Sequence, residues 1–570
     1  MAAEYCLWSV CFVPLDGNTP RIFGFPEFLT GFALIFIAWT LADVRYKFRL
    51  EVAPLPLQAI TFPSVVLIGV LALITDLWRA EEWLVPRGNV ITPSGWQAIL
   101  AGAFLLIIIS WVLFAFIRPA KYGMLNAKKY AKTLYRVIAN GDERELRQIA
   151  DEIRRSVYNI IKYAADRKES FPDKNGEEIK LQGKKVRRVN GYAADIILLI
   201  ADKRFCRAIV EHSPITIFYF YDSISALKRY NIDVRIFSKN IVNAALSYED
   251  SFLYHEDSWY YTGLIGGHRL ISRAMFSDRM IVDRNALLFD VPYDININQL
   301  KVYCRIVLIA FDGSVRDRSD FHSFAIGGAL RHMSAAISGI SRLDNVSDQL
   351  VEKDEIGKLR CVIEFVNDAL EIMDLKAKNY LQSIVREKEG THRYIDDLVG
   401  VVYDAIHCSA YLKSNDFKTW NIQNNTIWME IFYSKTDSVS LARKALCFRL
   451  RRKLYNEILQ LSKFINYEGA RILGYCLNVM GFSVNSDIKS RKECIPLHKA
   501  VLAWTRKNYS ALYARNQSVA EACLIQSITY DPVTFRLIKT FPPILGREPR
   551  REYFDVDPLA CPTVPGEADA

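Results

Sequence analysis

The chain has 570 residues, 51% of them hydrophobic and 24% charged, and its mean hydropathy is +0.05. The length allows several domains with buried cores, and 27 Gly, 20 Pro and 11 Cys exclude a collagen-like, low-complexity or disulfide-scaffold protein. The net charge of +10 would suggest nucleic acid as the partner of a soluble protein. The apolar segments described next favour a lipid bilayer instead, and nucleic acid is the weaker alternative.

Three long stretches near the amino terminus are almost free of charge. Residues 22–42 contain one charged side chain, and residues 52–75 and 88–117 contain none. Each stretch is near or above the ~20 residues that a transmembrane helix needs. We therefore expect a three-span transmembrane region over residues 22–117, preceded by an extracytoplasmic tail over residues 1–21.

Positive charges predict the orientation of these spans. The first loop holds Arg45, Lys47 and Arg49, and the segment after the third span carries six Lys and Arg before its first acidic residue, whereas the second loop mixes both signs. Lys and Arg accumulate on the cytoplasmic side of membrane proteins. We expect a multi-pass protein of the cell inner membrane with its N-terminus outside and residues 118–570 in the cytoplasm.

The cysteines fit this topology. Cys6 and Cys11 would lie outside, where they are either oxidised to each other or packed as thiols in a short helix. The other nine cysteines, from Cys206 to Cys561, are scattered without a C-x-x-C pair. That pattern is typical of buried free thiols in a reducing compartment.

Beyond the membrane the apolar spacing is helical, so the predicted fold is mostly α, with stacked helical hairpins as one possibility. A membrane-proximal hairpin is expected over residues 118–165, where Asn140-Gly141 ends one helix and Asp142 with Glu145 forms a capping box. The rest of the chain reads as three segments: a charged exposed loop over 166–190, an α-helical cytoplasmic domain over 191–540, and a Pro-rich tail over 541–570.

Eight helical segments are expected in the cytoplasmic domain. Their approximate ranges are 192–212, 220–250, 322–342, 348–388, 392–413, 436–467, 468–481 and 496–528. Residues 302–311 are rich in β-branched and aromatic side chains and suit a strand as well as a buried helix. Their helical surroundings favour a helix.

No motif names a reaction. Phosphate-binding loops, dinucleotide fingerprints, zinc signatures and the nucleophile elbow are all missing, so neither a metal nor a cofactor is expected. The catalytic candidates are Glu256, His268, Asp312, His322 and Arg331, because imidazole near carboxylates can perform acid–base chemistry if a pocket joins them. The alternative is that these residues only cap and terminate helices.

Two basic groups are candidates for contact with a membrane or an acidic partner. The first group is Lys128, Lys129, Lys132 and Arg136, just after the third span. The second group is Arg449, Arg451, Arg452 and Lys453, in a helix with interleaved apolar residues. Such a helix is equally typical of a solvated surface, and RNA is a third possibility.

Ala98 and Gly102 form a small-x-x-x-small pair that would let the third span of one copy pack closely on another copy. The whole pattern favours a membrane-anchored helical scaffold or sensor domain that binds an unidentified cytoplasmic protein. Two alternatives stay open. One is an oligomeric effector whose cytoplasmic domain gates a pore, and the other is an enzyme whose site is assembled from distant residues.

Overall fold

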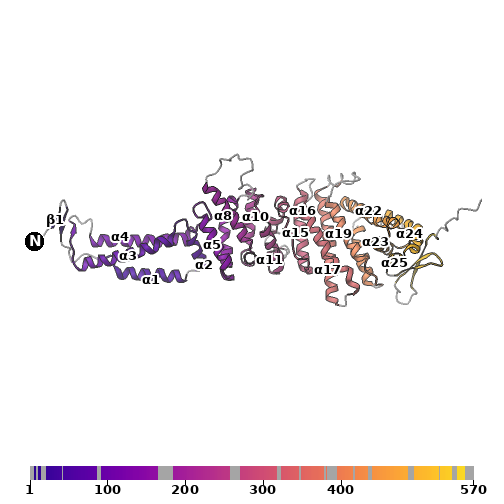
Figure 1. The fold of residues 1–570 in the computed structure, drawn as a ribbon, viewed down its shortest axis with the longest axis horizontal. Coiled ribbons are helices and arrows are strands. Elements are labelled where there is room, and N and C mark those ends of the chain that lie inside the picture. Colours follow the sequence, from indigo (N-terminus) through magenta and orange to yellow (C-terminus); the bar gives the residue numbers. More distant parts are fainter. Residues whose placement is uncertain are drawn as a thin grey trace, which may run out of the picture. The chain divides into compact units, whose positions relative to one another are not determined.

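The structure is a computed structural model, and it is mostly helical (Figure 1). It describes residues 5–7, 10–13, 21–41, 43–86, 92–164, 184–256, 270–316, 323–345, 348–377, 381, 394–414, 417–433, 440–484, 493–525, 527–541 and 549–558. The chain divides into two compact units, Met1–Ala244 and Ala245–Ala570.

Unit 1 begins with a small antiparallel sheet of order β1-β2-β3. Its strands are Tyr5–Leu7 (β1), Val10–Val13 (β2) and Val85–Pro86 (β3). The register places Cys6 opposite Cys11, and Cys11 is disulfide-bonded. The predicted tail thus contains two strands, which pair with each other as a local hairpin, and β2 also pairs with residues more than 70 positions away.

Three apolar helices pack together in unit 1. They are α1 (Phe25–Leu41), α3 (Leu57–Ala80) and α4 (Pro93–Val112), and α4 continues as a π-helix, η1 (Leu113–Ile117). Their shared core includes Phe28, Val65, Ile68, Leu100 and Phe104.

Two glycines allow the rings of this core to approach neighbouring helices. A Cβ at Gly31 would lie 2.7 Å from the Phe104 ring, and a Cβ at Gly69 would lie 2.6 Å from the Phe28 ring. These distances are shorter than carbon atoms tolerate, so larger residues at either position would push the helices apart.

Two of these helices are long and apolar enough to cross a membrane. The qualifying segments are Ala59–Ala80 and Pro93–Ile117, and only 33% and 17% of their most apolar windows are buried inside the protein. The apolar part of α1, Phe25–Ile37, is shorter. Among the described residues the structure therefore offers two candidate spans and not the three that were predicted.

The other helices of unit 1 follow from amphipathic patterns. They are α2 (Val44–Glu51), α5 (Ala127–Asn140), α6 (Glu143–Ile153), η2 (Arg154–Ser156), α7 (Val157–Tyr163), α8 (Lys184–Ile200), α9 (Lys203–His212), α10 (Ile215–Ala226) and α11 (Arg235–Ser247). The predicted break after Asn140 and the cap at Asp142 are confirmed, since the Asp142 carboxylate accepts a 2.7 Å hydrogen bond from Glu145 N. Packing pairs α5 with α8 and α6 with α9.

The charged loop predicted over 166–190 is wrong in its last seven residues. Helix α8 begins at Lys184, and residues 166–183 lie outside the described residues. The physical reason is tertiary, because Val189 is buried and its carbonyl accepts a hydrogen bond from the hydroxyl of buried Tyr122 at 2.5 Å. Tertiary packing at Val189 can therefore make this charged segment helical.

Unit 2 is an array of helices, several of which lie side by side (Figure 1). They are α13 (Leu270–Phe276), α14 (Arg279–Arg284), α15 (Ile297–Arg316), α16 (Phe324–Ala336), η4 (Ser338–Asn345), α17 (Gln349–Lys376), α19 (Tyr394–Ser409), α20 (Phe417–Trp420), η5 (Asn421–Met429), α21 (Glu430–Phe432), α22 (Leu441–Lys463), α23 (Tyr467–Met480), α24 (Ile495–Arg515) and α25 (Gln517–Ala522). Residues 302–311 lie within α15, so the helical prediction for them is confirmed.

A second antiparallel sheet ends unit 2, and the sequence did not reveal it. Its strands are Ile528–Asp531 (β4), Arg536–Thr540 (β5) and Arg551–Asp555 (β6), in the order β4-β5-β6. The expected Pro-rich tail over 541–570 therefore contains a strand. The prolines of this region flank β6 and do not interrupt it, so the ladder to β5 forms without loss of a backbone donor.

Candidate functional site

The most elaborate junction in unit 1 lies where α2 meets η1 and α6. The Arg49 guanidinium donates through Nη2 to Glu152 Oε2 at 2.6 Å and through Nη1 to the Ala115 carbonyl at 2.8 Å. Both charged side chains are buried, with 7% and 6% of their surface exposed. A buried ion pair needs such close geometry and extra hydrogen bonds to offset the loss of hydration.

Pro119 explains why a side chain reaches the Ala115 carbonyl. In a regular α-helix that carbonyl would accept from the amide four residues later, and Pro119 has no N–H. The chain also widens into a π-helix here, with Arg118 N bonded to Leu113 O at 2.7 Å. Arg49 supplies the donor that the helix itself lacks.

A cavity of about 370 Å³ lies beside this junction. It is mainly apolar, and its lining residues are Ile35, Trp39, Asp43, Tyr46, Leu50, Ile107, Ile108, Trp111, Val112, Ala115 and Phe116. Ala115 therefore has two contacts. It lines the cavity, and its backbone carbonyl accepts a hydrogen bond from Arg49. Leu50, the chain neighbour of Arg49, lies on the same wall.

Two aromatic pairs shape the cavity walls. Trp39 and Trp111 meet edge to face with ring centroids 5.1 Å apart, and Tyr46 and Phe116 lie 4.5 Å apart. The indole Nε1 of Trp111 donates to Thr61 Oγ1 at 3.0 Å, which fixes that ring in orientation. Each pair joins the α1–α2 side of the cavity to the α4–η1 side.

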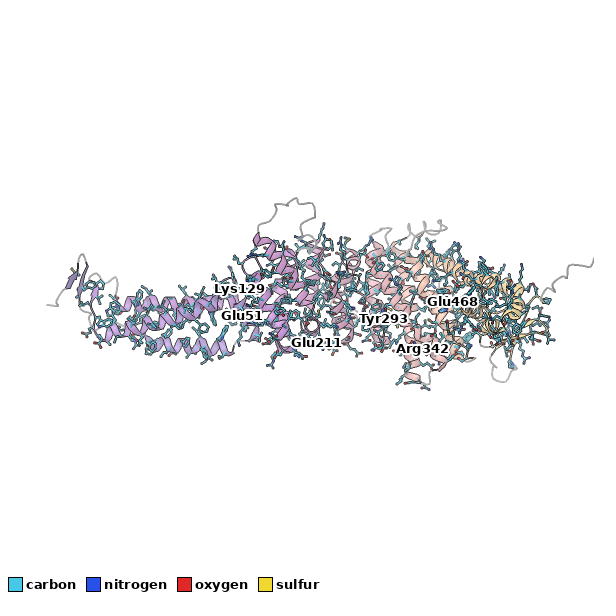
Figure 2. The ribbon with its side chains drawn as sticks, in the orientation of Figure 1. Glu51, Lys129, Glu211, Tyr293, Arg342 and Glu468 are labelled. Carbon is cyan, nitrogen blue, oxygen red and sulfur yellow. The ribbon has the colours of Figure 1, made fainter. Side chains whose placement is uncertain are left out.

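The first basic group borders the junction from α5. Lys129 Nζ donates to the Ala53 and Pro54 carbonyls at 3.3 and 3.4 Å, and Arg136 forms an ion pair with Glu51. Figure 2 shows Glu51 and Lys129 close together in this region. Lys128 and Lys132 are exposed. Lys129 thus binds the loop after α2 and Arg136 binds the last residue of α2, and Lys128 and Lys132 remain available to an external partner.

A polar network fastens the opposite end of the apolar helices. Asp76, near the end of α3, accepts hydrogen bonds from Phe25 N at 2.8 Å and from Gln97 Nε2 at 3.1 Å, and pairs with Arg21 at 3.3 Å. Gln97 in turn accepts from Ile22 N at 3.2 Å and is fully buried. One carboxylate and one amide therefore tie α1, α3 and α4 together.

The structure does not unite the described catalytic candidates. Glu256 is buried and accepts hydrogen bonds from Ile271 N, Ser272 N and Ser272 Oγ at 2.7, 3.1 and 2.6 Å. It thereby caps α13, and burial raises the pKa of its carboxyl despite these bonds.

The other candidates have separate environments. Asp312 forms an ion pair with Lys376, and the Arg331 guanidinium lies 5.8 Å from the centre of the Phe324 ring. His268 and His322 lie outside the described residues. Glu256, Asp312 and Arg331 thus serve different local contacts, which fits the structural interpretation better than a shared catalytic pocket.

The second basic group is largely engaged within unit 2. Arg449 pairs with Asp396, Arg451 pairs with Glu493 at 3.6 Å, and Lys453 Nζ lies 4.1 Å from the centre of the Tyr403 ring. Arg452 is the exposed member of the four, with its guanidinium 5.8 Å from the Phe448 ring centre. These intramolecular contacts leave little of the group for a membrane or a nucleic acid.

The small pair on α4 lies on its outer surface. Ala98 and Gly102 are exposed, and a Cβ placed on Gly102 would meet no heavy atom within 4 Å. Across the described residues, no group of three His, Cys, Asp or Glu side chains is arranged to hold a metal ion. Eight described cysteines are free, and seven of these thiols are buried.

Sequence reasoning missed the cavity and the buried ion pair. The signals were an arginine on the apolar face of a short amphipathic helix and a proline two residues after a long apolar run. Both signals are weak alone, because neither says which distant residue completes the contact.

Comparison with protein-family models, with curated proteins and with solved structures finds no match to this chain. The fold itself defines the class: a mostly α-helical protein whose described part has two helices long and apolar enough to span a membrane.

Proposed function

We propose that the protein is an integral membrane sensor or scaffold, in which membrane-embedded helices hold a helical cytoplasmic domain that binds a protein partner. One observation carries this proposal. Ala115 lines the cavity among the apolar helices and also accepts from Arg49, which is paired with Glu152 of α6. A change in the cavity therefore has a direct physical route to the first helices beyond the membrane.

The surface of the apolar helices supports membrane insertion. Large apolar side chains point outward on all three, among them Leu34, Val66, Leu67, Ile99 and Leu106, each 58–64% exposed. So much exposed apolar surface on neighbouring helices is costly in water and favourable in lipid. We propose that α1 crosses with α3 and α4, because it shares their core and the Asp76 network closes all three at one end.

The cysteines support an inner membrane with the N-terminus outside. Cys11 is disulfide-bonded, whereas Cys206, Cys304, Cys447 and Cys476 are buried free thiols. Disulfides persist in oxidising compartments and are rare in the cytoplasm. This assignment agrees with the positive charges of the first loop and of α5.

The proposal includes self-association. Ala98 and Gly102 are exposed on α4 with open space above Gly102, which suits a close helix–helix contact with another copy. The cytoplasmic partner of the helical domain is a protein whose identity the chain does not specify.

The test begins with the full-length protein in its host membrane and then in lipid nanodiscs. We expect it to remain in the membrane after an alkaline carbonate wash and to be a dimer in nanodiscs, and a monomer would contradict the proposed self-association. Release by carbonate would contradict the membrane assignment. A ring of several subunits that conducts ions in a planar bilayer would instead favour the gated pore.

A further inference from the structure

The cavity beside the α2–η1 junction combines aromatic walls with a single carboxylate. Trp39, Tyr46, Trp111 and Phe116 contribute four rings, and Asp43 is the one charged residue among those that line it in the described part of the chain. The Asp43 side chain makes no capping hydrogen bond to α2, although it occupies the N-cap position. Its charge is therefore available to the cavity.

The nearby arginines do not compete for this carboxylate. Arg45 lies 3.7 Å from Asp151, and Arg49 lies 2.6 Å from Glu152. Each of these arginines faces a carboxylate of α6, and Arg154 and Arg155 lie 3.8 Å from the same two carboxylates. The Arg49 guanidinium also lies 5.3 Å from the centre of the Tyr46 ring, so a ligand cation would contact Trp39, Trp111 and Phe116.

We propose that this cavity binds a monovalent lipophilic cation, a quaternary ammonium or phosphonium ion with an apolar body. Aromatic faces attract cations of this kind, and the exposed Asp43 carboxylate among the lining residues adds a charge interaction. The apolar lining from Ile35, Ile107 and Ile108 suits the body of the ligand. A volume of about 370 Å³ lies in the range of small-molecule sites.

This inference deepens the proposed sensor function and rests on it, because it names the ligand class for the same junction. The ligand would contact Ala115 and Leu50, which adjoin the Arg49–Glu152 pair. A ligand in the cavity would then change the contacts of α6, because Arg49 is paired with Glu152 on that helix. A neutral or anionic molecule of equal size would gain the apolar contacts and not the charge interactions.

The experiment uses the full-length protein in nanodiscs and two ions of nearly equal shape and opposite charge, tetraphenylphosphonium and tetraphenylborate. Binding is measured by equilibrium dialysis against empty nanodiscs of the same lipid. We expect saturable binding of tetraphenylphosphonium, at one ion per chain, and only lipid partitioning of tetraphenylborate. Equal binding of both ions above the empty nanodiscs, or no saturable cation binding, would overturn the proposal.

The variant Asp43→Asn removes the charge and keeps the shape of the side chain. We expect its Kd for tetraphenylphosphonium to rise about tenfold. Glu81→Gln is the matched control, because Glu81 is an exposed carboxylate at the far end of α3, and its Kd should equal that of wild type. An unchanged Kd in Asp43→Asn would overturn the role of this carboxylate.

The two proposals fail in different ways. Protein that resists carbonate and inserts into nanodiscs yet binds no cation would contradict the ligand class and leave the membrane anchor standing. Protein that carbonate releases would contradict the anchor itself. Size-exclusion profiles of the nanodisc samples show whether Asp43→Asn is folded, and the wild-type comparison of the two ions needs no variant.

Discussion

Arg49 and Glu152 lie 103 residues apart in the sequence and form a buried ion pair with 2.6 Å between Nη2 and Oε2. The pair joins α2, the short helix between the apolar helices α1 and α3, to α6 in the layer of helices that follows the apolar helices. Removing one partner of such a pair leaves a buried charge without compensation, which is the more damaging change.

Glu152→Gln is therefore expected to destabilise the junction by about 3 kcal/mol. The measurement is hydrogen–deuterium exchange of the full-length protein in nanodiscs, where amides of α2 and α6 should exchange faster. The double variant Arg49→Met with Glu152→Leu removes both charges and should recover part of the protection, because the Ala115 carbonyl still loses its donor. Unchanged exchange in the single variant would show that the pair does not hold α2 in place.

The two sides of the membrane can be distinguished with single cysteines at exposed positions. Trp83→Cys lies beyond α3, and Leu125→Cys lies between η1 and α5, where the side chain is 83% exposed. We expect a membrane-impermeant maleimide to label Trp83→Cys in intact spheroplasts and Leu125→Cys only after lysis. Wild-type protein supplies the background, and the reverse pattern would invert the proposed topology.

Asp76→Ala tests the network at the other end of the apolar helices. Asp76 accepts from Phe25 N and Gln97 Nε2 and pairs with Arg21, so its loss leaves polar groups without acceptors. We expect a local cost of about 1–3 kcal/mol, seen as faster amide exchange in the first turn of α1. Glu81→Gln, on the same end of α3, should exchange like wild type.

Lys539 gives a pH-dependent prediction for unit 2. Burial lowers the pKa of its ammonium to about 8, although Glu552 opposes the shift, and Nζ donates to the Asn478 carbonyl at 2.5 Å. Between pH 8 and about 10.5 the unfolded chain holds this proton more strongly than the folded one, so the Lys539 contribution to stability rises with pH in that window.

Lys539→Met lacks this titration. Relative to wild type, the variant should therefore lose about 2 kcal/mol of stability between pH 7 and pH 10. The measurement is the difference in Tm between the two full-length proteins at each pH, which cancels the other titrating groups. A difference that does not change with pH would contradict the lowered pKa.

Local features of this fold were predictable from the sequence. The break after Asn140, the cap at Asp142 and the helix over 302–311 depend on neighbours within a few residues or on a long apolar face. The two-residue strand β3 was not predictable, because it forms only by pairing with β2, more than 70 residues away. The strand β6 was missed because its flanking prolines suggested an extended tail, although they leave its ladder to β5 intact.

The candidate site escaped prediction for the same reason. Trp39 and Trp111, or Arg49 and Glu152, come together only after three helices have packed, and no single segment carries a motif for the cavity. Glu256 and Asp312 were candidates because their side chains can perform acid–base chemistry. In the structure, Glu256 caps a helix and Asp312 forms a surface ion pair. Side-chain type without position is weak evidence for chemistry.

The contacts of Arg49 form in an order set by the sequence, and Pro119 is the reason that the Ala115 carbonyl needs this donor. The Ala115 carbonyl receives its donor from Arg49, which is synthesised 66 residues earlier, while Glu152 emerges later still. Until then the Arg49 charge is unpaired, and an unpaired charge resists passage through lipid. In the proposed topology, the residue that ends up buried between helices would thus act with Arg45 and Lys47 to hold the first loop on its side of the membrane while the rest of the anchor is being made.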